Sequence, residues 1–222
     1  MHFDRIHLLL DASGPVTHVG LLHHNQWLAL YGSETPALES LFQGVVQCLR
    51  EAALSLDAVK GFIYCDGPGS TLGLRLSAMA LKTWRSLPQW QETPVYTYHR
   101  LNFAAALVSA KPDLTYPFNL ITEFRKGSWH CLTIQSADTL ANTSIKVLEF
   151  EDLNPLSGTF WHLPQRNLDP PPVDRQLLNY TIQPLPELLT QFDLLQRVNM
   201  PEPFSQEQPQ YQRWTAQRHK TP

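Results

Sequence analysis

The chain has 222 residues, of which 43% are hydrophobic, and its 17 basic and 20 acidic residues give a net charge of −3. This length and apolar content suit one large domain or two small lobes with real cores, and they exclude a disordered chain. The near-neutral charge predicts no strong attraction to nucleic acid or to a membrane surface, and no window approaches the roughly 18 apolar residues of a membrane span.

The N-terminus and the cysteines point to the cytoplasm. The apolar run 6–10 is too short for a secretion signal, and Asp4 stands where such a signal carries positive charge. Cys48, Cys65 and Cys131 are odd in number, widely spaced and set among apolar residues. They are expected to be buried thiols in a reducing compartment.

The first hundred residues predict an α/β unit. Strands are expected at 6–11, 16–22, 26–31, 59–65 and 94–98, and helices at 36–53, 74–87 and 100–110. The order is βββαβαβα, in which three strands of a meander are followed by two steps that add parallel strands. This is the repeating unit of the two-lobed actin, Hsp70 and sugar-kinase fold, which is ribonuclease H-like.

The second half reads as a degenerate copy of the first. Strands are predicted at 117–123, 128–134, 144–150 and 158–163, with a turn at 141–143, and a last helix at 186–198. Eleven of the 18 prolines lie at or beyond position 155. Because proline removes a hydrogen-bond donor and breaks helices, this half should be rich in loops. We therefore predict an N-terminal lobe at 1–110 and a C-terminal lobe at 111–222.

The most informative stretch is the glycine turn, residues 66–75, with the sequence DGPGSTLGLR. It joins an apolar strand to a helix, and Ser70 or Thr71 can cap that helix. It lacks the Gly-Lys-Ser/Thr of a P-loop, and its glycines do not follow the dinucleotide-binding pattern. Such a turn either approaches a phosphate or packs closely against another element or subunit, and packing is the favoured interpretation.

The turn also carries a family resemblance. Its residues Gly67, Pro68, Gly69, Ser70, Gly73 and Arg75 resemble the signature of the TsaB (YeaZ) family. Further segments are similar to family motifs in the same order along the chain: 10–13 (LDAS), 53–57 (ALSLD), 123–127 (EFRKG) and 209–213 (PQYQR). The chain departs from the family at the start of its first helix, where only Glu39 remains of the usual element, and at Thr71, Leu72 and Ser77.

The resemblance implies an accessory subunit without catalysis of its own, and without a metal or cofactor. TsaB-like proteins take part in making threonylcarbamoyladenosine at position 37 of tRNA. They pair with a TsaD-like paralogue that transfers the threonylcarbamoyl group, and a TsaE-like ATPase joins them; tRNA would be met only indirectly, and a homodimer is possible. The pairing surface would lie on the helices 36–50 and 73–87, and the residues expected on it are Leu38, Glu39, Leu41, Phe42, Val45, Gly73, Leu74, Ser77 and Leu81.

One alternative stays open, a small ATP-binding enzyme of the actin and sugar-kinase type. Asp11 ends the first strand, where an acid helps to hold magnesium in ATP-using relatives. Against this, the segment 161–166 has no glycine where an adenosine-binding loop is expected, and the chain has no His-x-x-x-His pair for a metal.

Overall fold

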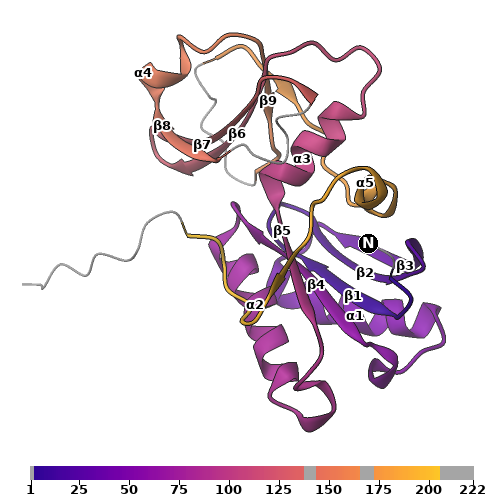
Figure 1. Cartoon of the computed structure of the whole chain (residues 1–222). Coiled ribbons are helices and arrows are strands. Elements are labelled where there is room, and N and C mark those ends of the chain that lie inside the picture. The colour runs from indigo at the N-terminus through magenta and orange to yellow at the C-terminus, as the bar shows by residue number, and fades with distance from the viewer. Residues whose placement is uncertain (1–2, 138–143, 166–172, 206–222) are drawn as a thin grey trace, which may run out of the picture.

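The computed structural model describes residues 3–137, 144–165 and 173–205, and it has two lobes that are each built on one mixed sheet (Figure 1). The predicted turn at 141–143, Arg166 and the motif at 209–213 lie outside the described residues. All three cysteines are buried and free, as predicted. Within the described ranges, no helix combines the length and the apolar character needed to cross a bilayer.

The first sheet confirms the predicted element order. Its strands are β1 (His7–Asp11), β2 (Thr17–His23), β3 (Gln26–Ser33), β4 (Gly61–Gly67), β5 (Val95–His99) and β11 (Gln196–Val198). They lie in the order β11-β5-β4-β1-β2-β3. The first three strands form an antiparallel meander, and β4 and β5 pair parallel to β1 and to β4.

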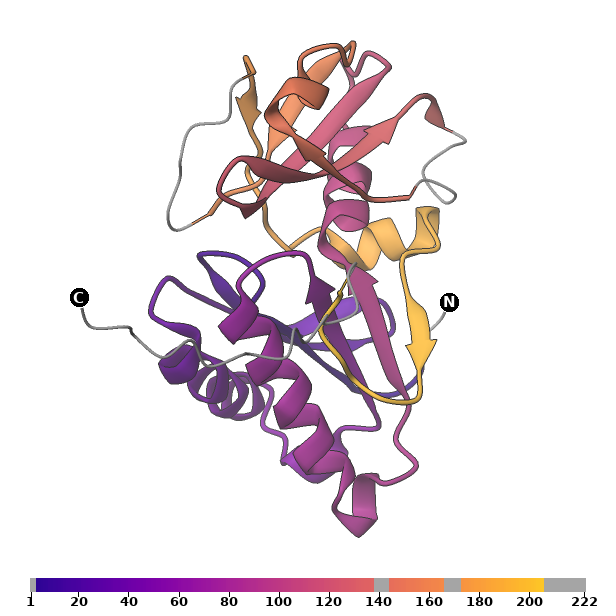
Figure 2. The ribbon, with the colours of Figure 1, turned by 90° about the vertical axis from the view of Figure 1, so that its left-hand side faces the viewer.

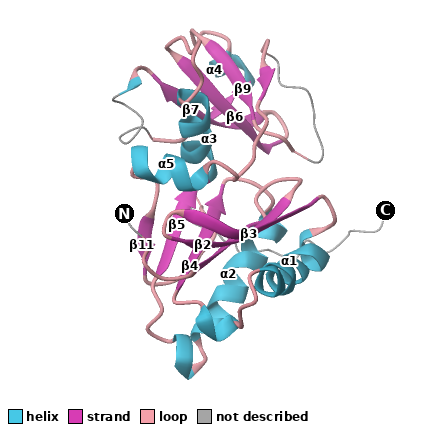
Figure 3. Ribbon diagram, turned by 90° about the vertical axis from the view of Figure 1, so that its right-hand side faces the viewer, coloured by secondary structure: helices cyan, strands magenta, loops and turns pink. Residues whose placement is uncertain are grey.

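Helices cover both faces of this sheet. The long helices α1 (Ala37–Glu51) and α2 (Thr71–Arg85) lie side by side on one face (Figure 2). On the other face, α3 (Arg100–Ser109) and α5 (Leu185–Gln191) lie between the two sheets (Figure 3). Because both faces are covered, every residue of β1 and β4 is buried. Short 3-10 turns at Leu56–Ala58 and Pro88–Trp90 precede β4 and β5.

The second sheet repeats the connectivity of the first, as the predicted second copy requires. Its strands are β6 (Phe118–Arg125), β7 (Ser128–Ile134), β8 (Lys146–Glu149), β9 (Thr159–His162) and β10 (Gln176–Leu177), in the order β10-β9-β6-β7-β8. Thus β6 to β10 occupy the places that β1 to β5 occupy in the first sheet. The short strand β10 was not predicted. The single-turn helix α4 (Phe150–Leu153) follows β8.

The two lobes share one hydrophobic core. The largest buried cluster contains Leu9 and Phe103 from the first lobe and Leu120 and Leu132 from the second, together with Leu188 of α5. A smaller cluster packs α1 and α2 onto the first sheet. The lobes are therefore joined by buried apolar surface as well as by the chain itself.

The last described residues return to the first lobe. The helix predicted at 186–198 ends at Gln191, and β11 pairs antiparallel with β5 instead. We call residues 196–205 the strap. The amide of Phe204 donates to the Asp66 carbonyl at 2.8 Å, and Glu202 lies 3.6 Å from Lys82 of α2. The strap thus belongs to the first lobe, although the predicted second lobe ran from 111 to 222.

Candidate functional site

The glycine turn connects β4 to α2 with little backbone freedom. Gly67 has a φ of +124°, which favours glycine. The Ser70 hydroxyl accepts a hydrogen bond from the Gly73 amide at 3.3 Å and so caps α2, as predicted. Pro68 is buried in the turn, whereas Arg75 is exposed on the first turns of the helix.

The glycines of this turn allow close backbone packing. The Ser70 amide donates to the Ser13 carbonyl at 2.8 Å. A side chain at Gly69 would run into the Ser13 carbonyl, and one at Gly73 would run into the Ala12 carbonyl. These two glycines therefore bring the start of α2 against the loop between β1 and β2, which agrees with the packing interpretation.

Asp11 is enclosed by protein hydrogen-bond donors. Its Oδ1 accepts from the Ser13 amide at 2.9 Å and from the Ser13 hydroxyl at 2.5 Å. Its Oδ2 accepts from the hydroxyls of Tyr98 and Tyr180, both at 2.8 Å. Burial alone raises the pKa of Asp11, but His18, the two hydrogen bonds from Ser13 and the charge of Arg100 together lower this pKa below its ordinary value. A metal ion at Asp11 would have to displace these hydroxyls.

Arg100 sits at the junction of the lobes, and the sequence reasoning missed it. It begins α3 directly after β5, and its side chain is only 1% exposed. Its Nη2 donates to the Pro164 carbonyl of the second lobe at 2.8 Å, and its guanidinium lies 4.9 Å from the centre of the Tyr180 ring. Gly14 leaves room for the guanidinium, since a side chain there would crowd Nη2. The signal in the sequence is an arginine at the start of a helix that has no other charged residue.

A pocket of about 290 Å³ lies beside these groups. Ser13 and Gly14 of the β1–β2 loop, Ser70 of the glycine turn, Arg100 and Gln165 of the second lobe contribute to its wall. Gln165 comes from the predicted 161–166 segment, whose described part supplies no glycine. The pocket is therefore lined by residues of both lobes, and its described second-lobe residues, Pro164 and Gln165, supply no glycine.

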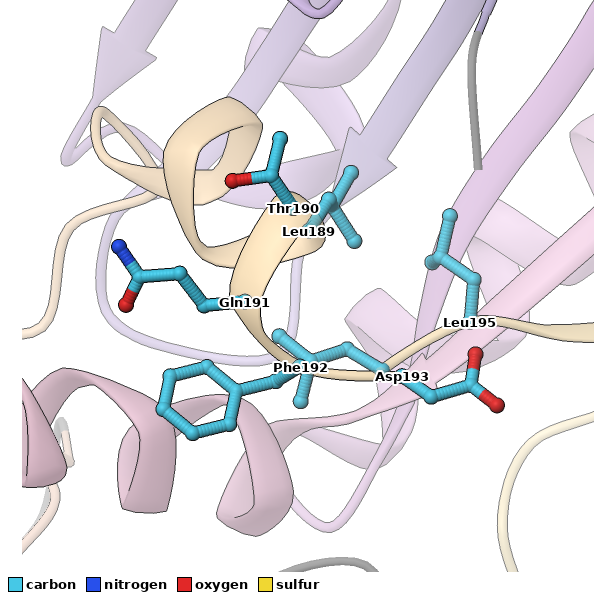
Figure 4. Close-up of a pocket in the computed structure, with 7 residues that line it drawn as sticks. Leu189, Thr190, Gln191, Phe192, Asp193 and Leu195 are labelled. Atoms are coloured by element: carbon cyan, nitrogen blue, oxygen red, sulfur yellow. The ribbon is translucent and has the colours of Figure 1, made fainter.

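A second pocket, of about 270 Å³, follows α5 (Figure 4). It is lined by the single continuous stretch 189–195, and Asp193 is the only ionisable residue in that lining. One carboxylate on a bend of the chain offers no second group for acid–base chemistry. Across the residues that the structure describes, no three His, Cys, Asp or Glu side chains are grouped so as to hold a metal.

The predicted pairing residues divide into two sets. Leu38, Glu39 and Phe42 of α1 are exposed, as a docking surface requires. The other six are buried against the chain's own sheet or loops, and these are Leu41, Val45, Gly73, Leu74, Ser77 and Leu81. Their apolar spacing marks the face of each helix that packs inward, so in this structure they lie beneath the exposed residues of the two helices.

Five of the exposed apolar residues lie on α1 and α2, and we call this set the α1–α2 face. Leu38, Phe42 and Val46 are 64%, 43% and 66% exposed and lie one helical turn apart on α1. On α2, Leu72 and Met79 are 63% and 57% exposed. The rings of Phe42 and Trp84 lie perpendicular to each other with centroids 6.3 Å apart, and this contact joins the two helices. The sequence reasoning included Leu38 and Phe42 but omitted Val46, Leu72 and Met79.

Comparison with known proteins identifies the architecture. No protein-family model and no curated protein matches the chain. Among solved structures, YeaZ from Pseudomonas aeruginosa has a TM-score of 0.61 at 18% identity, over 84% of this chain and 89% of that one. A protein described as similar to the peptidase YeaZ from Pseudomonas aeruginosa has a TM-score of 0.54 at 21% identity, over 72% of this chain and 75% of that one. The chain therefore has the fold of YeaZ.

Proposed function

We propose that this chain is a non-catalytic partner subunit that scaffolds a TsaD-like threonylcarbamoyltransferase in the modification of tRNA at position 37. A TsaE-like ATPase would join the pair, and tRNA would contact the assembly mainly through the other subunits. The observation that carries the proposal is the α1–α2 face, on the helices where the family resemblance places pairing.

The α1–α2 face has the properties of a protein-binding surface. Its five exposed apolar side chains belong to two packed helices, whereas single exposed apolar residues scattered over a surface need no explanation. The buried residues beneath pack both helices against the sheet, so the chain's own core sets the positions of the two helices. Covering it would remove apolar area from water, which is the main favourable contribution to association.

The state of Asp11 supports a role without catalysis. Its four hydrogen bonds come from the protein, and one of the donors, Tyr180, follows β10 at the end of the second sheet. An ATP-dependent enzyme of this fold would need that carboxylate to face magnesium. The alternative function, a small ATP-binding enzyme, therefore has less support. A titration with ATP and magnesium tests it, because tight binding that Asp11→Asn abolishes would favour the enzyme.

Co-purification with the TsaD-like subunit of the same cell tests the proposal. Leu38→Glu places a charge on the α1–α2 face and should weaken the association at least about tenfold, because the carboxylate would be desolvated against apolar surface. Leu177→Glu on β10 is the matched control, since Leu177 is 63% exposed and Leu38 is 64% exposed. It should leave the association unchanged.

Three results would overturn this function. The first is that the wild-type chain does not associate with the TsaD-like subunit, while a deletion strain keeps its threonylcarbamoyladenosine. The second is that Leu38→Glu and Leu177→Glu behave alike. If the chain instead pairs with itself through the α1–α2 face and excludes the TsaD-like subunit, the heterodimer proposal is likewise wrong.

A further inference from the structure

The end of the strap is held against the first lobe through its backbone. Tyr64 of β4 bonds to Glu202 twice, since its hydroxyl accepts from the Glu202 amide at 2.9 Å and donates to the Glu202 carbonyl at 3.0 Å. The Phe204 amide donates to the carbonyl of Asp66, which also belongs to β4. An extended segment that is bound through its main chain docks in the way that a peptide ligand does.

Two prolines prepare this segment for docking. Pro201 and Pro203 alternate with Glu202 and Phe204 along the chain. Proline fixes its own φ and favours an extended conformation at the residue before it. The segment therefore loses less conformational entropy when it closes onto the lobe, and the prolines stand where no amide is available to be bonded.

The same segment buries little of its own surface. Among residues 200–205 only Pro201 is buried, whereas every residue of β4 beneath it is buried. The free energy of local opening falls with the number of buried apolar contacts that must be broken. Residues 200–205 should therefore open at a much smaller free energy than the sheet on which they lie.

Phe204 lies against an acid–base pair, Asp66 and His99. His99 Nδ1 is 2.6 Å from Asp66 Oδ1, and among the described residues Asp66 is the only hydrogen-bond partner of this imidazole. The rings of Phe204 and His99 are T-shaped, with centroids 4.9 Å apart. A carboxylate that holds one imidazole nitrogen leaves the other nitrogen to accept a proton or to bind a ligand.

We propose that residues 200–205 form a lid that opens as one unit and uncovers the Asp66–His99 pair. The fixed end of the lid is β11, which pairs with β5, together with Asn199, whose carbonyl accepts from Arg85 of α2. In the closed state the side chains of His99 and Asp66 are 32% and 9% exposed. Opening removes Phe204 from the imidazole and gives solvent and ligands access to it. The lid is separate from the α1–α2 face and does not rest on the proposed function.

Amide hydrogen exchange of the full chain, resolved residue by residue, tests whether the lid opens on its own. The Phe204 amide reports on the lid, and the Ile63 amide reports on the buried strand β4. The protection factor of Phe204 should be at least about a hundredfold below that of Ile63, because lid opening does not require the sheet to unfold.

A tyrosine variant tests whether the lid opens as one unit. Tyr64→Phe removes both bonds to Glu202 but leaves the bond of the Phe204 amide intact. If the segment is one unit, the Phe204 amide should exchange at least about tenfold faster in this variant, because the closed state loses two hydrogen bonds. The matched control is Tyr96→Phe, which removes a hydroxyl from the neighbouring strand β5 and should leave Phe204 exchange unchanged.

Labelling with diethyl pyrocarbonate, which acylates imidazole nitrogens, follows the pair beneath the lid. The reference within each sample is His24, whose side chain is 64% exposed. The rate at His99 relative to His24 should rise in Tyr64→Phe. It should also rise in Pro203→Gly, which loosens the lid without removing a hydrogen bond and decides the test if Tyr64→Phe fails to fold.

Three results would overturn the lid. The first is that the Phe204 amide is as well protected as the Ile63 amide. The second is that Tyr64→Phe accelerates exchange at Glu202 alone, which would show separate bonds and no common opening. The third is that His99 is labelled at the same relative rate in the wild type and in both variants, so that nothing covers it.

Discussion

Asp11 is held by donors that are far apart in the sequence. Tyr98 is the second-last residue of β5, and Tyr180 lies 169 residues from Asp11, yet both hydroxyls reach the same oxygen. Tyr180→Phe removes one of these bonds and leaves a buried carboxylate less well solvated. We expect a loss of about 1.5–3 kcal/mol in the free energy of unfolding, measured by urea denaturation.

A second tyrosine provides the control for this change. Tyr96 contacts Phe3 and His7 through its ring, with centroids 6.2 Å and 5.9 Å apart. Tyr96→Phe keeps those contacts, so its unfolding free energy should stay within about 0.5 kcal/mol of the wild type. Equal losses in the two variants would show that the Tyr180 hydroxyl does not stabilise Asp11.

His162 should make stability depend on pH. It is fully buried beside Trp129, and neither ring nitrogen is hydrogen-bonded to a described residue. Burial, followed by the charge of Arg175, lowers the pKa of His162 from 6.5 to about 4, although the Gln165 side chain acts to raise this pKa. Between these values the unfolded chain binds a proton that the folded chain does not, so the contribution is present above pH 6.5 and is lost on acidification toward pH 4.

His162→Leu isolates this effect from that of other histidines. The wild type should lose up to about 3 kcal/mol more than the variant as the pH falls through this window, as followed by urea unfolding at several pH values. The variant should also match or exceed the wild type at neutral pH, because leucine buries no unpaired nitrogen. Identical pH slopes for the two proteins would contradict the assignment.

At the scale of elements, two helical glycines should respond differently to alanine. Alanine favours a helix over glycine by about 1 kcal/mol. At Gly73 of α2, however, the new methyl group would meet the backbone of Ala12, which cannot move alone. At Gly44 of α1 it would meet the side chains of Tyr31 and Val19, which can adjust. Gly73→Ala should therefore cost at least about 2 kcal/mol more than Gly44→Ala in thermal or urea unfolding.

A larger loss of unfolding free energy for Gly44→Ala than for Gly73→Ala would mean that the contact between the glycine turn and the β1–β2 loop is loose. Far-ultraviolet circular dichroism on both variants would first confirm that helix content is retained. A similar cost at both sites would show that the loop carrying Ala12 can shift away as readily as the ring of Tyr31.

The sequence predicted elements well where local pattern and tertiary packing agree. The helices α1 and α2 and the strands β1 to β5 were found, because apolar spacing there records burial on the chain's own sheet. The same spacing runs from Pro186 to Val198, but only its first part is helical. Its end forms β11, which pairs with the edge of β5 that would otherwise be unpaired. The local sequence has no pattern that indicates this pairing.

The candidate site was predictable only in part for the same reason. The glycine turn has a recognisable pattern, and its cap at Ser70 follows from it. Arg100 and Gln165 carry no local motif, since their importance comes from the second lobe lying against the first. Apolar periodicity also does not separate a helical face that packs inward from one that stays exposed, and this is why Leu41 and Val45 were grouped with Leu38 and Phe42.

At the scale of the whole molecule, the shared core predicts one cooperative unit. The main cluster contains residues of both lobes, and Trp27 of β3 donates to the Gln183 carbonyl at 2.9 Å. Hydrogen exchange in low urea should therefore give the amides of β4 and of β7 the same free energy of opening. Earlier opening of β7 would show that the second lobe unfolds on its own.

The course of the strap decides how this protein should be handled in binding experiments. Phe204 is hydrogen-bonded to Asp66 and lies against Gly67, directly before α2, whereas Phe3 lies at the opposite end of the first sheet. An affinity tag or fluorophore on the C-terminal side would therefore leave the described structure beside the helices of the α1–α2 face. Immobilisation through the N-terminus keeps that face free, so a pull-down that fails with a C-terminal tag should be repeated with an N-terminal one.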